Sequence, residues 1–224
     1  MPLWARSITK YQMTTSLVAS EFVSELVADQ PSSVDMMIGI GLVKDTDAVY
    51  FQYLGEEQSP SALMLPSGKP CTRLPHVTLT GIEIAEDIGE FNSTKLNLFL
   101  SSNAGRTVML TSGLQTIWSQ CIITALMGVF GEYALNAPMT IDTWKGTSKM
   151  RPCFGAIRQG PTKMSDTATY EALRDARSDR DQKLVERIMR ESVELLQGAL
   201  GIEHTSVQDV TDVATESVDE DTEF

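Results

Sequence analysis

Residues 95–113 read KLNLFLSSNAGRTVMLTSG, and this stretch decides the class of fold. Leucine recurs at every second position, at Leu96, Leu98 and Leu100, and the polar run SSNAGR then separates this pattern from Val108 and Leu110. Alternating apolar residues on both sides of a short turn that contains glycine are typical of a β-hairpin with one buried face. The sequence therefore predicts two antiparallel strands here.

The next residues, 114–131, follow a helical period. Apolar side chains recur about every 3.6 residues, at Leu114, Ile117, Trp118, Cys121, Ile122, Ala125, Leu126, Val129 and Phe130. The opposite face carries serine, threonine and glutamine but no charge, which indicates a helix that is largely buried. We expect this helix to lie against the sheet.

Further strands are predicted on both sides of this pair of elements. Residues 34–55 contain two β-rich runs around the turn-like KDTD, which favours a second hairpin. Residues 60–75 are rich in proline and hold a short strand, and residues 76–89 predict a strand whose alternation shifts phase at Gly81. Two more strands, at 139–144 and 152–159, are joined by a polar, basic turn.

Together these elements predict an α+β fold. Short strands marked by glycine favour an antiparallel β-barrel or half-barrel, and an OB-like Greek key is the first expectation. We expect a globular, β-rich core over residues 1–164, with helices near 16–29 and 114–131. One long amphipathic helix should follow over 165–202, and the acidic, aperiodic residues 203–224 predict a disordered tail.

Charge and cysteine content indicate the cellular compartment. The net charge is −12, and residues 207–224 contain seven acidic and no basic residues, so over half of the excess lies in the tail. The three cysteines, Cys71, Cys121 and Cys153, are widely spaced, which argues against a disulfide framework and fits free thiols in a reducing compartment. We find no signal peptide and no uninterrupted apolar span, so we expect a cytoplasmic protein with no membrane partner.

No catalytic motif is present in the sequence. The two histidines, His76 and His204, stand alone, and no metal-ligand pair, nucleophile elbow or phosphate-binding loop occurs. We therefore expect neither an enzyme nor a bound cofactor or metal. An enzyme whose site is assembled from scattered residues stays open as an alternative.

A candidate nucleic-acid-binding segment spans residues 143–164, which include five basic and no acidic residues. Cations that neutralise phosphates and aromatic rings that stack on bases are the two components of sequence-tolerant single-strand binding. The same pattern also fits a solvated strand pair whose aromatic residues belong to the core. Phe51 and Tyr53 form a second aromatic cluster, on one face of a predicted strand. The candidate residues are Trp144, Lys145, Lys149, Arg151, Phe154, Arg158, Lys163, Phe51 and Tyr53.

The chain ends TESVDEDTEF, at residues 215–224. An acidic run followed by phenylalanine can dock as a peptide whose ring fills a pocket while its carboxylates meet basic residues. The alternative is that the run only increases solubility. This ending resembles the acidic tails of bacterial and phage single-stranded DNA-binding proteins, which recruit replication and repair proteins and follow a core that is often of the OB type. The resemblance is confined to the tail, and it implies partner binding by Asp219, Glu220, Asp221, Glu223 and Phe224.

The basic segment and the acidic tail together predict a single-stranded DNA-binding protein of replication, recombination or repair. In this reading the tail competes with DNA for the basic segment and recruits partners once DNA is bound. The alternative is a non-enzymatic phage or plasmid subunit for assembly or protein interaction, which oligomerises through its C-terminal helix. A homo-oligomer is compatible with both readings.

Overall fold

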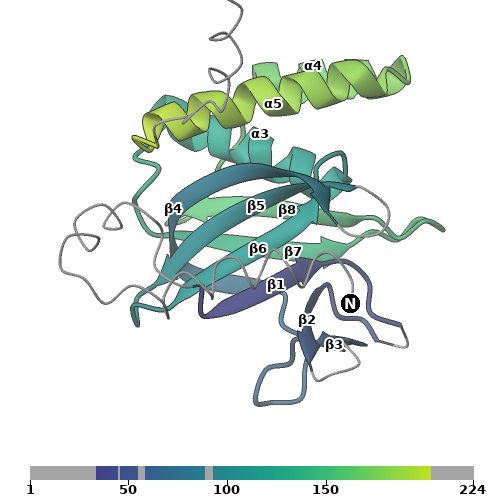
Figure 1. Ribbon diagram of the computed structural model, residues 1–224, viewed down its shortest axis with the longest axis vertical. Coiled ribbons are helices and arrows are strands. Elements are labelled where there is room, and N and C mark those ends of the chain that lie inside the picture. The colour runs from purple at the N-terminus through teal and green to yellow at the C-terminus, as the bar shows by residue number, and fades with distance from the viewer. Residues whose placement is uncertain (1–33, 45, 55–58, 89–92, 203–224) are drawn as a thin grey trace, which may run out of the picture.

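The computed structural model describes residues 34–44, 46–54, 59–88 and 93–202 (Figure 1). The helix predicted near 16–29 and the tail at 203–224 lie outside these residues. Nine strands and three helices make up the described part, which confirms the α+β class.

All nine strands belong to one sheet. They are β1 (Met36–Ile40), β2 (Tyr50–Leu54), β3 (Ser59–Ala62), β4 (Arg73–Ile88), β5 (Ser93–Ser102), β6 (Thr107–Gly113), β7 (Met139–Lys145), β8 (Cys153–Gln159) and β9 (Thr162–Lys163). Their order in the sheet is β3-β2-β1-β6-β5-β4-β7-β8-β9. The predicted hairpins at 34–55 and 95–113 are present as β1–β2 and β5–β6, and the predicted strands at 139–144 and 152–159 are β7 and β8.

The expected antiparallel, OB-like barrel is wrong, because the sheet is open and mixed. β3 and β9 are its two edges, and β1 and β6 run parallel to each other. The parallel pair arises because β6 returns to β1 only after the chain has formed β2 to β5. Such a long-range pairing leaves no mark on the local alternation of residues, so the sequence pattern could not show it.

β4 is the longest strand, and it joins two parts of the sheet. Its N-terminal end pairs with β7, and the rest pairs with β5. The register to β5 shifts between Leu79 and Gly81, which confirms the phase shift predicted at Gly81. Because of this bulge, both Leu79 and Ile82 lie in the core.

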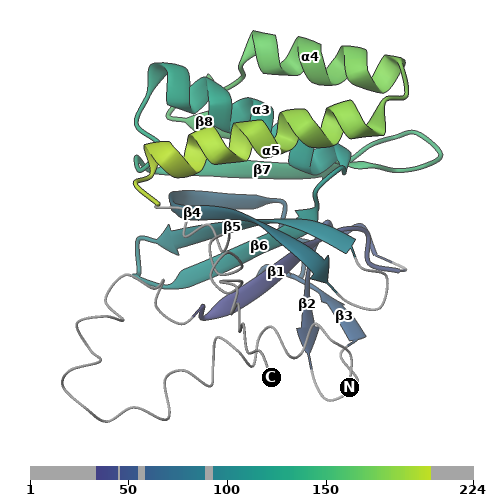
Figure 2. The ribbon, with the colours of Figure 1, turned by 45° about the horizontal axis from the view of Figure 1, so that its top comes forward.

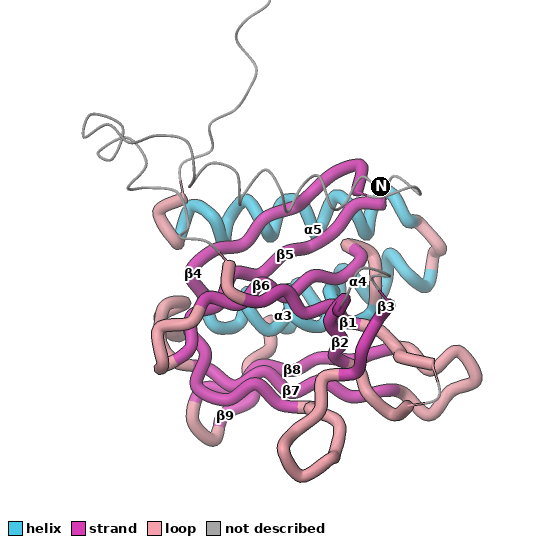
Figure 3. The backbone as a smooth tube through the Cα atoms, turned by 60° about the horizontal axis from the view of Figure 1, so that its bottom comes forward, coloured by secondary structure: helices cyan, strands magenta, loops and turns pink. Residues whose placement is uncertain are grey.

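The sheet curls so strongly that strands distant in its order meet. Tyr50 of β2 and Thr143 of β7 are separated by four strands, yet their side-chain oxygens are 2.6 Å apart. The helices lie behind the strands in the view of Figure 3. The sheet therefore curves around the helices on one of its faces, but its edge strands β3 and β9 do not pair to close a barrel.

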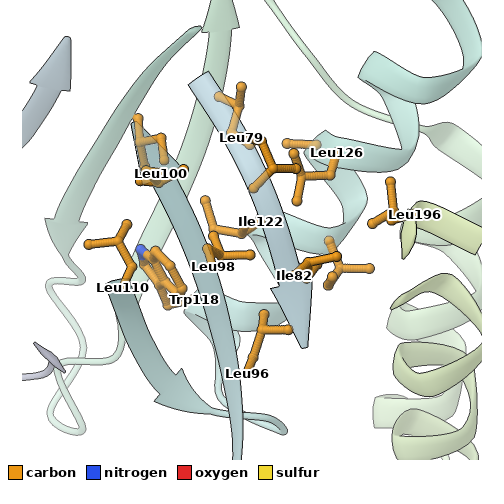
Figure 4. Packing of buried hydrophobic residues seen from close by; sticks show 14 of the residues in the cluster. Leu79, Ile82, Leu96, Leu98, Leu100, Leu110, Trp118, Ile122, Leu126 and Leu196 are labelled. Atoms are coloured by element: carbon orange, nitrogen blue, oxygen red, sulfur yellow. The ribbon is translucent and has the colours of Figure 1, made fainter. Parts of the chain in front are cut away.

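α3 (Ile117–Glu132) is the predicted buried helix, and its position against the sheet is confirmed. Thr116 caps its first turn by accepting a hydrogen bond from the backbone N–H of Ser119. Trp118, Ile122 and Leu126 point toward the leucines of β5 and the inner side chains of β4 (Figure 4). All three side chains are at most 1% exposed, so α3 forms the centre of the core.

The single helix expected over 165–202 is wrong, because two helices occupy these residues. They are α4 (Thr167–Ser178) and α5 (Gln182–Ala199), which lie with α3 in a layer over the strands (Figure 2). Arg180 adopts a positive φ of 56° between them, and the side chain of Asp181 accepts a hydrogen bond from the N–H of Leu184. An aspartate at the N-cap position favours the start of a new helix, so the chain forms two helices here instead of one.

Candidate nucleic-acid interface

Trp144 and Phe154 form a stacked aromatic pair on the outer face of β7 and β8. The two residues are direct cross-strand partners, and their ring centroids lie 6.0 Å apart with an interplanar angle of 16°. Alternation along β7 places Met139, Ile141 and Thr143 in the core and therefore turns Trp144 outward. Trp144 is 43% exposed, so one face of its ring can receive a further planar group.

One of the candidate basic residues meets an acid from a different part of the chain. Lys145 forms an ion pair with Asp47, which lies in the loop between β1 and β2. The hydrogen bond and the charge of Lys145 hold the pKa of the Asp47 carboxyl below its ordinary value, and the charge of Arg151 acts in the same direction. The segment 143–164 contains no acid of its own, but the fold supplies one.

Arg158 is likewise balanced, by Asp142 of β7. Its Nε lies 3.2 Å from one carboxylate oxygen of Asp142, and Nε of Arg73 lies 2.5 Å from the other. Partial burial acts to raise the pKa of Asp142, but the hydrogen bonds from the two arginines outweigh it and lower the pKa. Two guanidinium groups around one carboxylate leave a net positive charge on this part of the outer face.

The turn between β7 and β8 carries two exposed cations. Lys149 and Arg151 are both exposed, and Arg151 has a positive φ of 44°. Arg151 lines an open depression together with Lys44 and Leu42 of the β1–β2 loop. Sequence reasoning missed Lys44 and Arg73, because each lies outside the basic segment and joins it only through the curl of the sheet.

Lys163 lies at the far end of this surface. It is in the edge strand β9, opposite Arg158 of β8. It also lines a cavity beside α3 and α4, so it borders both the outer face of the strands and the helical side of the sheet.

The structure does not bring Phe51 to the Trp144–Phe154 pair. The ring of Phe51 crosses β1 at Gly39, where a Cβ atom would lie only 2.3 Å from Cζ of Phe51. Tyr50 points inward to Thr143, so Phe51 and Trp144, the next residue in each strand, point outward from opposite walls of the curled sheet. The side chain of Tyr53 and the tail residues Asp219, Glu220, Asp221, Glu223 and Phe224 lie outside the described part of the chain.

Comparison with protein-family models, with curated proteins and with solved structures gave no match. Within the described residues, no helix is long and apolar enough to cross a membrane. The same part of the chain contains no cluster of three or more histidine, cysteine, aspartate or glutamate side chains that could hold a metal ion. Its three cysteines are free thiols, as the sequence predicts.

Proposed function

We propose that the protein binds single-stranded nucleic acid through the outer face of β7 and β8. The observation that carries this proposal is the exposed ring of Trp144, which is backed by Phe154 and adjoins a basic turn. A ring held flat by a stacked neighbour loses little conformational freedom when a base stacks on it. Stacking of this kind contributes roughly 1–3 kcal/mol per base and tolerates any base.

Phosphate groups would be held on both sides of the stacked base. Lys149 and Arg151 lie in the turn beside the aromatic pair. Arg158 lies four residues beyond Phe154, which is about 13 Å along β8. A single strand that runs along β8 thus meets cations, then the ring, then the net positive charge around Asp142.

The ion pairs limit the expected affinity. Lys145 is held by Asp47, and Asp142 neutralises one of its two arginine partners. Apart from Lys44 in the β1–β2 loop and Lys163 in the edge strand β9, about three positive charges therefore remain for phosphates, namely Lys149, Arg151 and one of the Arg73–Arg158 pair. Release of counterions from a single strand by about three contacts gives a log–log salt slope of about −2.

A role in replication, recombination or repair is part of the same proposal and rests on the acidic tail. Its carboxylates, including Asp219, Glu220, Asp221 and Glu223, would compete for the basic turn when DNA is absent. Phe224 would then be read by partner proteins when DNA displaces the tail.

The alternative of an assembly subunit is not favoured by α5. Its apolar stripe is buried inside this chain, against α3 and β4, with Val185, Met189 and Leu196 fully covered. Gln197 of the same face donates a hydrogen bond to the carbonyl of Ile82. The outward face of α5 is mainly charged, although Leu195 is 54% exposed, so α5 offers no continuous apolar surface for a second copy.

The test is binding of labelled oligo-dT to wild type and to Trp144→Leu. The substitution should weaken binding by roughly 1–3 kcal/mol. Tyr170→Leu removes an exposed ring from α4 and serves as the matched control, with unchanged binding expected. If folded wild type does not retain oligo-dT at low salt, or if both variants bind equally well, the proposal fails.

A further inference from the structure

The turn between β7 and β8 carries an exposed methionine at its tip. Met150 is 87% exposed, whereas other apolar side chains on the surface are less so, such as Leu195 at 54% and Tyr170 at 49%. Lys149 and Arg151, which flank Met150, are exposed as well. In Figure 1 and Figure 2 this turn extends beyond the body of the protein. The turn thus presents one apolar side chain between two cations.

Backbone hydrogen bonds define the shape of this turn. The N–H of Gly146 donates to the carbonyl of Pro152 at 2.7 Å and continues the hairpin past the last paired residues of β7 and β8. The N–H of Arg151 donates to the carbonyl of Ser148 at 2.9 Å. This second bond closes a β-turn in which Met150 is a central residue. The position of Met150 relative to β7 and β8 is therefore fixed by the backbone.

Arg151 has a backbone conformation that favours glycine. Its φ is 44°, and a residue with a Cβ atom is strained in this left-handed region. Glycine would relieve the strain, so the turn itself does not require an arginine at this position. The side chain of Arg151 lines the open depression that also includes Lys44 of the β1–β2 loop. A strained residue with an exposed, positively charged side chain points to an anionic ligand beside Met150.

The turn continues directly from the stacked pair of Trp144 and Phe154. Gly146 lies against the ring of Phe154, where a Cβ atom would be only 2.8 Å from Cε2. Met150 precedes Phe154 by four residues, so their Cα atoms are at most about 14 Å apart. A nucleic-acid strand with a base stacked on Trp144 therefore reaches the turn within a few nucleotides.

A double helix that continues such a strand would meet the tip of the turn. A base can stack on Trp144 only after it has left the duplex, so the two strands must separate between the ring and the tip. Exposed apolar side chains, methionine among them, insert between neighbouring bases and unstack them in proteins that deform DNA. Lys149 and Arg151 are placed to hold the phosphates on either side of the opened step.

We propose that Met150 is a wedge and that the preferred ligand is a junction between a single strand and a duplex. The single strand lies over Trp144 and Phe154, and Met150 inserts at the first base pair of the duplex. This inference rests on the proposed function, because it requires that the outer face of β7 and β8 binds the single strand.

The test compares the affinity of the full chain for oligo-dT, for the same oligo-dT joined to a short hairpin duplex, and for the duplex alone, by fluorescence anisotropy. Tails at the 5′ and at the 3′ end are both measured, and a preference for one of them suffices. The tailed duplex should bind roughly three- to tenfold more tightly than oligo-dT, because burial of Met150 more than offsets the unstacking of one base step. A 2-aminopurine in the first base pair should become brighter on binding, since unstacking relieves its quenching.

Substitutions assign the preference to the tip of the turn. Met150→Ser should abolish the preference for the tailed duplex and the increase in 2-aminopurine fluorescence, while the affinity for oligo-dT stays unchanged. Met150→Leu keeps a large apolar side chain and should retain both effects. Met64→Ser, at an exposed methionine in the loop between β3 and β4, is the matched control and should change neither. Because Met150 is so exposed, its substitution should not affect folding.

The outcomes separate this inference from the proposed function. If the folded protein binds oligo-dT and the tailed duplexes equally well, the wedge is overturned and the single-strand site remains. The wedge is also overturned if Met150→Ser keeps the preference. Binding that depends on Met150 but occurs only with vesicles of phosphatidylserine and phosphatidylcholine would assign the tip to a membrane instead. If neither oligo-dT nor either tailed duplex binds at low salt, the proposed function and the wedge both fail.

Discussion

Trp118 donates a hydrogen bond from Nε1 to Oγ1 of Thr143 at 3.0 Å, which ties the first turn of α3 to the middle of β7. The same oxygen lies 2.6 Å from the hydroxyl of Tyr50 in β2. All three residues are at most 1% exposed. Gly155 lies opposite Thr143 in β8 and leaves room for this contact, because a Cβ atom at Gly155 would lie only 2.9 Å from Nε1 of Trp118. The contact holds β2, β7 and α3 together and so maintains the curl of the sheet.

Replacing Thr143 by valine should therefore destabilise the fold. Thr143→Val keeps the shape but leaves the Trp118 N–H and the Tyr50 hydroxyl without their partner, and each unsatisfied buried group costs about 1–3 kcal/mol. Thr140→Val on the outer face of the same strand is the control, with a change below about 0.5 kcal/mol. Urea denaturation measures both variants. Equal free energies of unfolding for Thr143→Val and wild type would show that the shared oxygen does not hold the curl.

The pH dependence of stability should reveal the Asp142 cluster. Its two arginine partners lower the pKa of this carboxyl in the folded protein. The resulting stabilisation is fully present above the unfolded pKa of about 3.9 and is lost as the pH falls through the lower, folded value. As the pH falls from 6 into the acid range, the free energy of unfolding should therefore decrease less steeply in Asp142→Asn than in wild type. Parallel curves for Asp142→Asn and wild type would contradict the assignment.

The same substitution should strengthen nucleic-acid binding. Without the carboxylate, Arg73 and Arg158 are both available to phosphate, so the affinity for oligo-dT should rise. The log–log salt slope should become steeper by about 0.7 for each added contact. Fluorescence anisotropy over a series of salt concentrations measures both quantities. An unchanged slope would mean that the strand does not pass over this part of β8.

Deletion of residues 213–224 tests the competition by the tail. This change removes five carboxylates, so oligo-dT should bind more tightly at low salt, and the gain should shrink as salt screens the competitor. Phe224→Ala should keep most of the competition but lose a partner protein in a pull-down from host extract. If the deletion does not increase affinity and Phe224→Ala loses no partner, the acidic run acts in solubility alone.

Local periodicity explains which parts of the fold were predictable. The alternating leucines of β5, the 3.6-residue spacing of α3 and the phase shift at Gly81 each follow from residues within one element. The parallel β1–β6 pair and the curl depend on residues far apart in the chain, so no single segment carries their signal. Asp181 is an N-cap residue and could have indicated the break between α4 and α5. The apolar stripe of α5 was instead interpreted as part of one longer helix.

The candidate site was predictable to a similar degree. The sequence predicts the two strands and their basic turn, and the structure adds that Trp144 and Phe154 are direct partners across them. The absence of acids from the segment was misleading, because Asp47 reaches Lys145 from the β1–β2 loop, 98 residues away in the sequence. Charge counted along a segment therefore differs from the charge that the folded surface presents, because the fold brings both acids and bases to it from outside the segment.

The most direct test of the proposed function is ultraviolet crosslinking of oligo-dT to the full chain, with the modified residues identified by mass spectrometry. Crosslinks form where a ring stacks on a base, so we expect them at Trp144 and Phe154. Their yield should fall as salt rises, and Tyr170 of α4 should stay unmodified. Crosslinks found only away from β7 and β8, or none in folded protein at low salt, would contradict a nucleic-acid interface on this face of the sheet.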